Sequence, residues 1–167
     1  AVWDHEVFVD NNNNGIYDTG DTFTDTNGDG LFTAEAYAIT NTSGAFTGLS
    51  GTGKIVATYL TDSSGNVLTT DVSTGLTFSS TYAAPDGSSI VNPLTSLIAA
   101  QLSSSTATAT EIAAAQTKVL ASLGVTLPTG SSLLTYDPLA VSSDSATAWA
   151  TAVAVQKVAA QVANTIQ

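Results

Sequence analysis

The seven residues Asn92-Pro-Leu-Thr-Ser-Leu-Ile98 mark the point at which the chain changes from strand-forming to helix-forming sequence. Asn92 carries a side-chain oxygen that can cap a helix, and Pro93 stands at the first helical position, where its missing N–H costs nothing. Leucine and isoleucine at positions 94, 97, 98 and 102 recur at helical spacing. The segment therefore predicts a helix that begins at residue 93 and buries one side.

Two further helices are expected after this point. Thr108 followed by Glu111 has the form of a capping box, and Gly124 supplies the stop signal. A longer helix is expected over about 144–165, with valines along one side, and a short helical turn is expected to open at Asp137-Pro138. On this alanine-rich helix we expect Trp149 to be packed inside the protein, between the helix and the sheet.

Before residue 92, runs of Val, Thr, Tyr and Phe are broken by Gly, Asn and Asp, as expected for strands joined by turns. We expect strands at 2–9, 34–40, 45–48, 54–61, 67–70 and 76–83, with 90–91 as a candidate closing strand. The sequence therefore predicts one α+β domain over residues 1–167. Its β-rich half, 1–91, forms an antiparallel sheet or sandwich, packed against about three helices in 92–167.

Composition limits the function classes. The 167 residues are enough to bury about 70% of the unfolded surface. A net charge of −11, with three lysines and no arginine, argues against nucleic acid or an anionic membrane surface as partner. Zero cysteine excludes disulfides and thiolate metal sites. No apolar run approaches the roughly 20 residues of a membrane span. Zero methionine, even at position 1, suggests a processed or excised chain.

The acidic segment 10–21 has the spacing of a calcium-binding loop. Such loops supply oxygens from positions 1, 3, 5, 7, 9 and 12, with glycine at position 6 for a sharp turn. Gly15 occupies the turn position. The expected ligands are the side-chain oxygens of five residues and the backbone carbonyl oxygen of Ile16. The five side-chain ligands are Asp10, Asn12, Asn14, Asp18 and Asp21.

A second loop repeats the first at an offset of fifteen residues. Its expected ligands are Asp25, Asn27, Asp29, the carbonyl of Leu31, and Glu35. Glu35 lies one residue earlier than the usual closing position, so this loop departs from the standard pattern at its end. The sequence therefore predicts one or two Ca²⁺ ions, with calcium favoured over magnesium because flexible oxygen cages suit the larger ion.

A simpler interpretation is that Asp, Asn and Gly only form turns between strands. Turns explain the composition, but they do not require oxygen-bearing residues at alternate positions in two successive loops. Eight of the fourteen acidic residues lie in the first 35 residues, and that stretch contains no Lys or Arg. A bound cation would neutralise these charges.

Other chemistry has weaker support. His5 is the one histidine and alternates with apolar residues on an expected strand, so a structural role is favoured over a catalytic one. No Gly-x-Ser-x-Gly motif accompanies the many serines. The segment 51–54, Gly-Thr-Gly-Lys, lacks the spacing of a phosphate loop and is expected to be a turn before a strand. We expect no enzymatic activity.

With these features in view, the chain resembles the calcium-dependent modules of very large bacterial extracellular adhesins, the biofilm-associated and RTX-adhesin-like proteins. The calcium loop that follows Val7-Phe-Val-Asp10 is the specific part of the resemblance. Less specific sequence similarity to this family is found at four further places: Thr70-Asp-x-x-Thr-Gly75, Val91-x-Pro-Leu-Thr-Ser-Leu97, Leu134-x-Tyr-Asp-Pro-Leu139 and Gln161-Val-Ala-Asn-Thr-Ile166. The resemblance implies a structural module of the cell surface, made rigid by calcium.

Three functions are therefore weighed. The first is a non-enzymatic, secreted structural or adhesion module rigidified by calcium, whose partners are calcium and neighbouring domains. The second is a calcium-dependent, self-assembling subunit of an extracellular filament, sheath or surface layer, which binds other copies of itself. The third is a carbohydrate-binding module that uses exposed aromatic side chains to bind a glycan.

Overall fold

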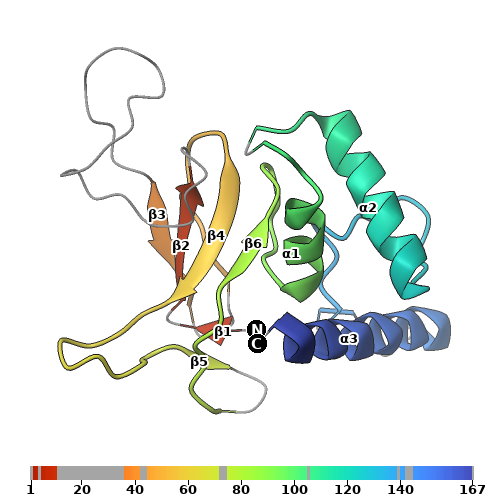
Figure 1. The fold of residues 1–167 in the computed structure, drawn as a ribbon. Coiled ribbons are helices and arrows are strands. Elements are labelled where there is room, and N and C mark those ends of the chain that lie inside the picture. The colour runs from red at the N-terminus through yellow and green to blue at the C-terminus, as the bar shows by residue number, and fades with distance from the viewer. Residues whose placement is uncertain are drawn as a thin grey trace. The chain divides into compact units, whose positions relative to one another are not determined.

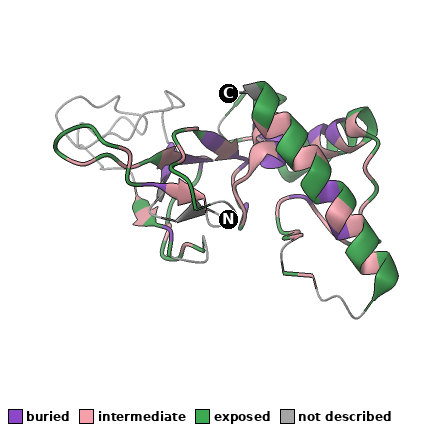
Figure 2. Ribbon diagram, turned by 90° about the horizontal axis from the view of Figure 1, so that it is seen from below, coloured by how far each residue is buried: buried purple, intermediate pink, exposed green. Residues whose placement is uncertain are grey.

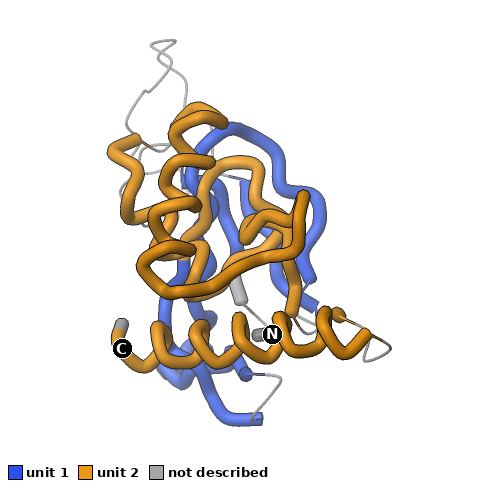
Figure 3. Tube along the Cα trace, turned by 90° about the vertical axis from the view of Figure 1, so that its right-hand side faces the viewer, with its two compact units in different colours: residues 1–82 blue, residues 83–167 orange. Residues whose placement is uncertain are grey.

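The computed structural model describes residues 2–3, 5–10, 36–41, 45–71, 75–104, 106–138, 140–141 and 145–166. The chain divides into two compact units, Ala1–Tyr82 and Ala83–Gln167 (Figure 3). The first contains most of the strands and the second contains the helices. The α+β class expected from the sequence is confirmed.

Four strands form the main sheet, in the order β3-β2-β4-β6 (Figure 1). Their bounds are β2 (His5–Asp10), β3 (Tyr37–Ile39), β4 (Lys54–Tyr59) and β6 (Tyr82–Ala84). Strand β2 runs antiparallel to both β3 and β4, and its six residues all pair with β4. Strand β6 begins at the last residue of the first unit and ends in the second.

The central strands are buried on both faces of the sheet. Because side chains alternate along a strand, Val7 and Val9 point to one face and Phe8 to the other. All three are buried, with Phe8 at 0% exposure, and their partners Ile55, Val56 and Ala57 on β4 are buried too. This explains why these segments are nearly continuous apolar runs rather than alternating ones.

A smaller two-stranded sheet pairs β1 (Val2–Trp3) with β5 (Thr70–Asp71) in antiparallel fashion. A hairpin leads from β4 toward β5, closed by an isolated bridge between Thr61 and Val67. The Asp62 carboxylate accepts hydrogen bonds from the backbone N–H groups of Ser64 and Asn66, at 2.8 and 2.9 Å, and from the Asn66 amide. This confirms the turn that the sequence predicts at 62–66.

Helix α1 (Pro93–Ala100) begins as expected. The Asn92 Oδ1 atom accepts hydrogen bonds from the N–H groups of Leu94 and Thr95, at 2.8 and 3.0 Å. The Thr95 hydroxyl also accepts a bond from the Asn92 N–H, which completes a reciprocal cap. Two of the four N–H groups that a helix start leaves without partners are thereby satisfied within the first turn.

Helix α2 (Ala109–Leu123) is bounded by the residues that the sequence singles out. The Thr108 hydroxyl accepts from the Glu111 N–H, and Glu111 accepts from both the N–H and the hydroxyl of Thr108. Gly124 ends the helix in the left-handed region, at φ 64°. The positive φ favours glycine because it has no Cβ to clash.

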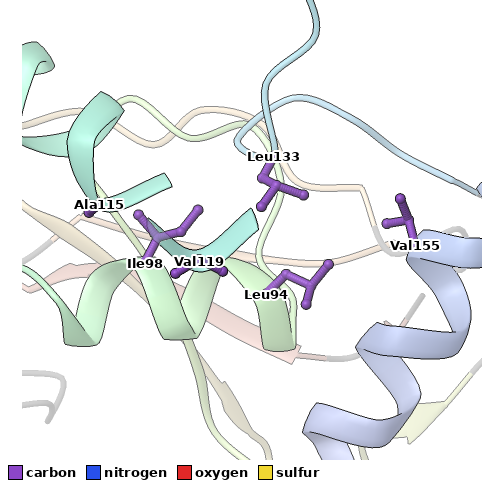
Figure 4. Close-up of a cluster of buried hydrophobic side chains, with 6 residues drawn as sticks. All are labelled: Leu94, Ile98, Ala115, Val119, Leu133 and Val155. Atoms are coloured by element: carbon purple, nitrogen blue, oxygen red, sulfur yellow. The ribbon is translucent and has the colours of Figure 1, made fainter. Parts of the chain in front are cut away.

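Helix α3 (Ala146–Ile166) is the longest, and buries only part of its surface. Along the helices buried and exposed positions recur, as expected for helices that pack on one side (Figure 2). The core of this unit is made by residues from all three helices and from the segment after α2: Leu94, Ile98, Ala115, Val119, Leu133 and Val155 (Figure 4).

Several sequence-based boundaries differ from the structure. Residues 45–48 and 90–91 are not strands, and 67–70 contributes two isolated bridges, at Val67 and Thr70, and the first residue of β5. Strand β6 is shorter than the expected 76–83. Asp137-Pro138 opens a turn, in which the Ala140 N–H donates to the Asp137 carbonyl at 3.2 Å, rather than a helix. Isolated β-propensity is a weak signal because a strand forms only where a partner strand accepts its backbone.

Candidate functional site: a buried ion pair beside the first acidic loop

Asp10 is the last residue of β2 and the first expected ligand of the first acidic loop. Its side chain is fully buried, at 0% exposure. The Nζ atom of Lys54 lies 3.4 Å from the Asp10 Oδ2 atom, and the Lys54 side chain is 24% exposed. The two residues are cross-strand partners in the register of β2 and β4. The ion pair therefore joins the ends of the two central strands.

Burial makes this carboxylate dependent on nearby positive charge. Taking an ionised group out of water is costly, and a buried ion that loses its partner destabilises a fold by about 3–5 kcal/mol. Lys54 supplies such a charge to Asp10 at ion-pair distance. Asp10 is thus both a buried residue of strand β2 and the first residue of the acidic loop sequence.

Gly53 allows the two strand ends to come close together. Its φ is 155°, a conformation that L side chains rarely adopt. A Cβ atom at this position would lie 2.9 Å from the backbone carbonyl oxygen of Asp10 and 3.3 Å from Cγ1 of Val9. Glycine is therefore required immediately before Lys54, where β4 begins beside the end of β2.

The remaining expected ligands, which extend from the first loop into the second, lie outside the described residues: Asn12, Asn14, Ile16, Asp18, Asp21, Asp25, Asn27, Asp29, Leu31 and Glu35. Within the described ranges, no three His, Cys, Asp or Glu side chains form a group that could hold a metal. Asp10 is thus the one expected ligand that the structure describes. A carboxylate is the hard oxygen donor that calcium prefers, so its chemistry fits that ion.

Sequence reasoning missed the role of Lys54. The sequence predicts segment 51–54 as a turn before the strand at 54–61 and gives Lys54 no further role, and the first 35 residues contain no Lys or Arg that could pair with Asp10. The counter-charge comes instead from across the sheet. The register of β2 on β4 would have predicted this ion pair. Aligning the apolar residues of the two antiparallel strands places Asp10, the last residue of β2, opposite Lys54, the first residue of β4.

Among the described residues, the two exposed tyrosines of the main sheet do not share a face. Tyr37 pairs with Phe8 and therefore lies on one face of the main sheet, whereas Tyr59 shares the face of Ala57, the partner of Val7. The two rings, 54% and 37% exposed, thus point to opposite faces. Trp149 is 50% exposed, so the expectation that it is packed inside the protein is wrong. Its helix is long enough to bury valines while Trp149 remains on the solvent side.

No protein-family model, curated protein or solved structure matches this chain. Among the described residues, no helix combines the length and the apolar character needed to cross a membrane.

Proposed function

We propose that this protein is a non-enzymatic, extracellular structural or adhesion module whose N-terminal unit is made rigid by calcium. The observation that carries the proposal is the position of Asp10. The first oxygen donor of a loop with calcium-site spacing is a fully buried residue of the central strand β2. A cation held by this loop would be tied directly to the core of the sheet.

Like-charge repulsion supports the same proposal. Eight acidic residues lie in the first 35, and the basic residue that pairs with Asp10 is one of three in the whole chain. A divalent ion would offset this excess of negative charge. Binding to the folded state stabilises it by RT ln(1 + [Ca²⁺]/Kd), about 2.7 kcal/mol at a calcium concentration a hundredfold above Kd. At the millimolar calcium found outside cells, even a weak loop of this type would be filled.

The test is a thermal melt of the protein in excess EDTA and in millimolar calcium, with magnesium as the matched cation control. We expect calcium to raise the melting temperature by several degrees and magnesium to raise it much less. Asp10→Asn should remove most of the calcium effect. Equal melting temperatures in EDTA and calcium would contradict the proposal.

A second candidate, calcium-dependent self-assembly, is favoured by one observation. Among the described residues, β3 is an edge strand of the main sheet. Its residues Tyr37 and Ile39 lie on the same face, and both side chains are more than half exposed. Exposed apolar residues on an edge strand favour pairing with another chain. Sedimentation of the same samples decides between the two functions. Polymers in calcium would support self-assembly. A monomer both in calcium and in EDTA would exclude self-assembly, and the rigid module would remain as the proposed function.

A further inference from the structure

A small hollow lies within the helical unit, between the segment that follows α1 and one side of α2. Its volume is about 190 Å³, and exposed residues form its rim. Gln101, Ser103 and Ser104 line it from the segment after α1, and Glu111 and Lys118 line it from α2. All the residues that line the hollow belong to the second unit, so it is a feature of that unit alone.

The hollow exists because small side chains separate two charged ones on α2. Glu111 and Lys118 lie seven residues apart on one side of the helix. Ala114 and Ala115 stand between them and fill little of the space. The floor is apolar, because Ala115 is 4% exposed and Leu102 packs against the core. An apolar floor with a few polar groups around it is the usual composition of a small-molecule site.

The two charges stand at opposite ends of the hollow. Seven residues of helix separate the Cα atoms of Glu111 and Lys118 by about 10.5 Å, at 1.5 Å per residue. The N–H and the hydroxyl of Thr108 donate to Glu111 Oε2 at 2.8 and 2.7 Å, which holds the carboxylate in place while Oε1 can accept from a ligand. In the described part of the chain, no acidic side chain forms an ion pair with Lys118. The hollow therefore offers an anion at one end and a cation at the other.

These dimensions and charges fit a short peptide with free ends. An apolar cavity of about 150 Å³ holds a molecule of the size of benzene, so an open hollow of 190 Å³ takes a compound of roughly ten non-hydrogen atoms. An extended dipeptide spans about 7 Å, which leaves room for an ion pair at each end. The hydroxyls of Ser103 and Ser104 and the amide of Gln101 can form hydrogen bonds with its central peptide group.

We propose that this hollow binds zwitterionic dipeptides with small side chains, with the ligand amine at Glu111 and the ligand carboxylate at Lys118. No aromatic ring lines the hollow, so it offers no surface on which a sugar could stack. Because both charged side chains are exposed, the ion pairs are screened by solvent and salt, and we expect a Kd of about 1 mM that rises with ionic strength. The site adds a small-molecule ligand to a protein whose proposed function is structural.

The first test adds alanyl-alanine to the full chain and follows backbone amide signals by ¹H–¹⁵N NMR. We expect saturable shifts in residues 101–118. N-acetyl-alanyl-alanine lacks the amine charge and alanyl-alaninamide lacks the carboxylate, so each should bind about three- to fivefold more weakly, the effect of losing one exposed ion pair. Equal binding of all three peptides would overturn the assigned charge contacts, and no shift in 101–118 well above the expected Kd would overturn the site.

The second test assigns each charge to its residue. Lys118→Met should weaken the binding of alanyl-alanine and leave that of alanyl-alaninamide unchanged, because the amide has no carboxylate to pair. Glu111→Gln, which can still form a capping box, should weaken alanyl-alanine and leave the N-acetyl peptide unchanged. Lys157→Met on α3 is the matched control, since Lys157 is exposed and does not line the hollow. Equal effects of Lys118→Met and Lys157→Met would overturn the role of Lys118.

The third test fills the hollow. Ala114→Leu places a larger side chain in it and should abolish the shifts, whereas Ala113→Leu is the control, because Ala113 is exposed on the same helix and does not line the hollow. Leucine is a good helix former, so both variants should fold. Full binding by Ala114→Leu would overturn the location of the site. If a variant does not fold, the three peptides on the wild-type chain decide the question.

Discussion

Gly53 sets how closely the two central strands approach at the end that carries Asp10. The backbone at Gly53 lies against the Asp10 carbonyl with no room for a side chain between them. This close approach of the two strands places the next residue, Lys54, beside the Asp10 carboxylate. The ion pair therefore depends on a neighbour that carries no charge.

Replacing Gly53 by alanine tests this dependence. Gly53→Ala combines a backbone conformation unfavourable to alanine with a 2.9 Å clash against a carbonyl oxygen, so we expect the free energy of unfolding to fall by about 2–4 kcal/mol. Gly65→Ala is the matched control, because Gly65 also has a positive φ, 85°, but nothing lies within 4 Å of the added Cβ. It should cost about 1 kcal/mol. Urea denaturation measures both; equal losses would refute the role of close approach.

At the scale of single elements, the helix ends of the second unit are stabilised by local polar contacts. The cap of α1 is formed by Asn92 and Thr95, and that of α2 by Thr108 and Glu111. Each contact joins residues no more than three positions apart. These elements were predictable from sequence because all the interacting groups lie within one helical turn.

The capping box of α2 predicts a pH dependence. Hydrogen bonds from the Thr108 backbone N–H, and secondarily from its hydroxyl, lower the pKa of the exposed Glu111 carboxyl below its ordinary value. Its contribution to helix stability is therefore present above the pKa of the unfolded chain, about 4.3, and is lost as the pH falls through the lower folded pKa. A carboxyl ¹³C NMR titration measures this pKa. Thr108→Ala removes the hydroxyl but keeps the backbone N–H, so the pKa of Glu111 should rise only part of the way toward its ordinary value; an unchanged pKa would show that the Thr108 hydroxyl makes no contribution.

The strands were less predictable than the helices for a physical reason. The expected strand 2–9 contains the apolar run Val7, Phe8 and Val9, but the structure divides it into β1 and β2, and β2 begins three residues later than expected. The segments 45–48 and 90–91 carry similar residue types but have no strand partner in the structure. The pairing of Asp10 with Lys54 joins residues far apart in the sequence, and no local pattern specifies it. The candidate calcium ligands are specified by spacing alone, and all but Asp10 lie outside the described residues.

At the scale of the whole molecule, the two units are stabilised by different kinds of packing. The first is built around strands that are buried on both faces, with an ion pair at one end. The second is built around a small apolar core in which Leu133, from the segment after α2, joins the three helices. The Gln116 side chain accepts a hydrogen bond from the Leu133 N–H at 3.0 Å and so fixes this segment to α2.

The helical unit should lose stability when the Leu133 side chain is shortened. Leu133 is 1% exposed, so Leu133→Ala should lower the free energy of unfolding by about 2–5 kcal/mol through lost burial and the cavity it leaves. Leu68→Ala is the control, since Leu68 is 48% exposed in the first unit, and it should change stability by less than about 1 kcal/mol. Far-ultraviolet circular dichroism during thermal unfolding measures both. A loss below 1 kcal/mol for Leu133→Ala would contradict the assigned core.

The pairing of β2 with β4 has a consequence for how the chain is made. Residues 5–10 leave the ribosome long before residues 54–59, their strand partners. At about 5–20 residues per second, the delay lasts roughly 2–10 s. During that interval Val7, Phe8 and Val9 cannot bury themselves against β4. The nascent chain therefore exposes this apolar segment to solvent until the partner strand has been synthesised.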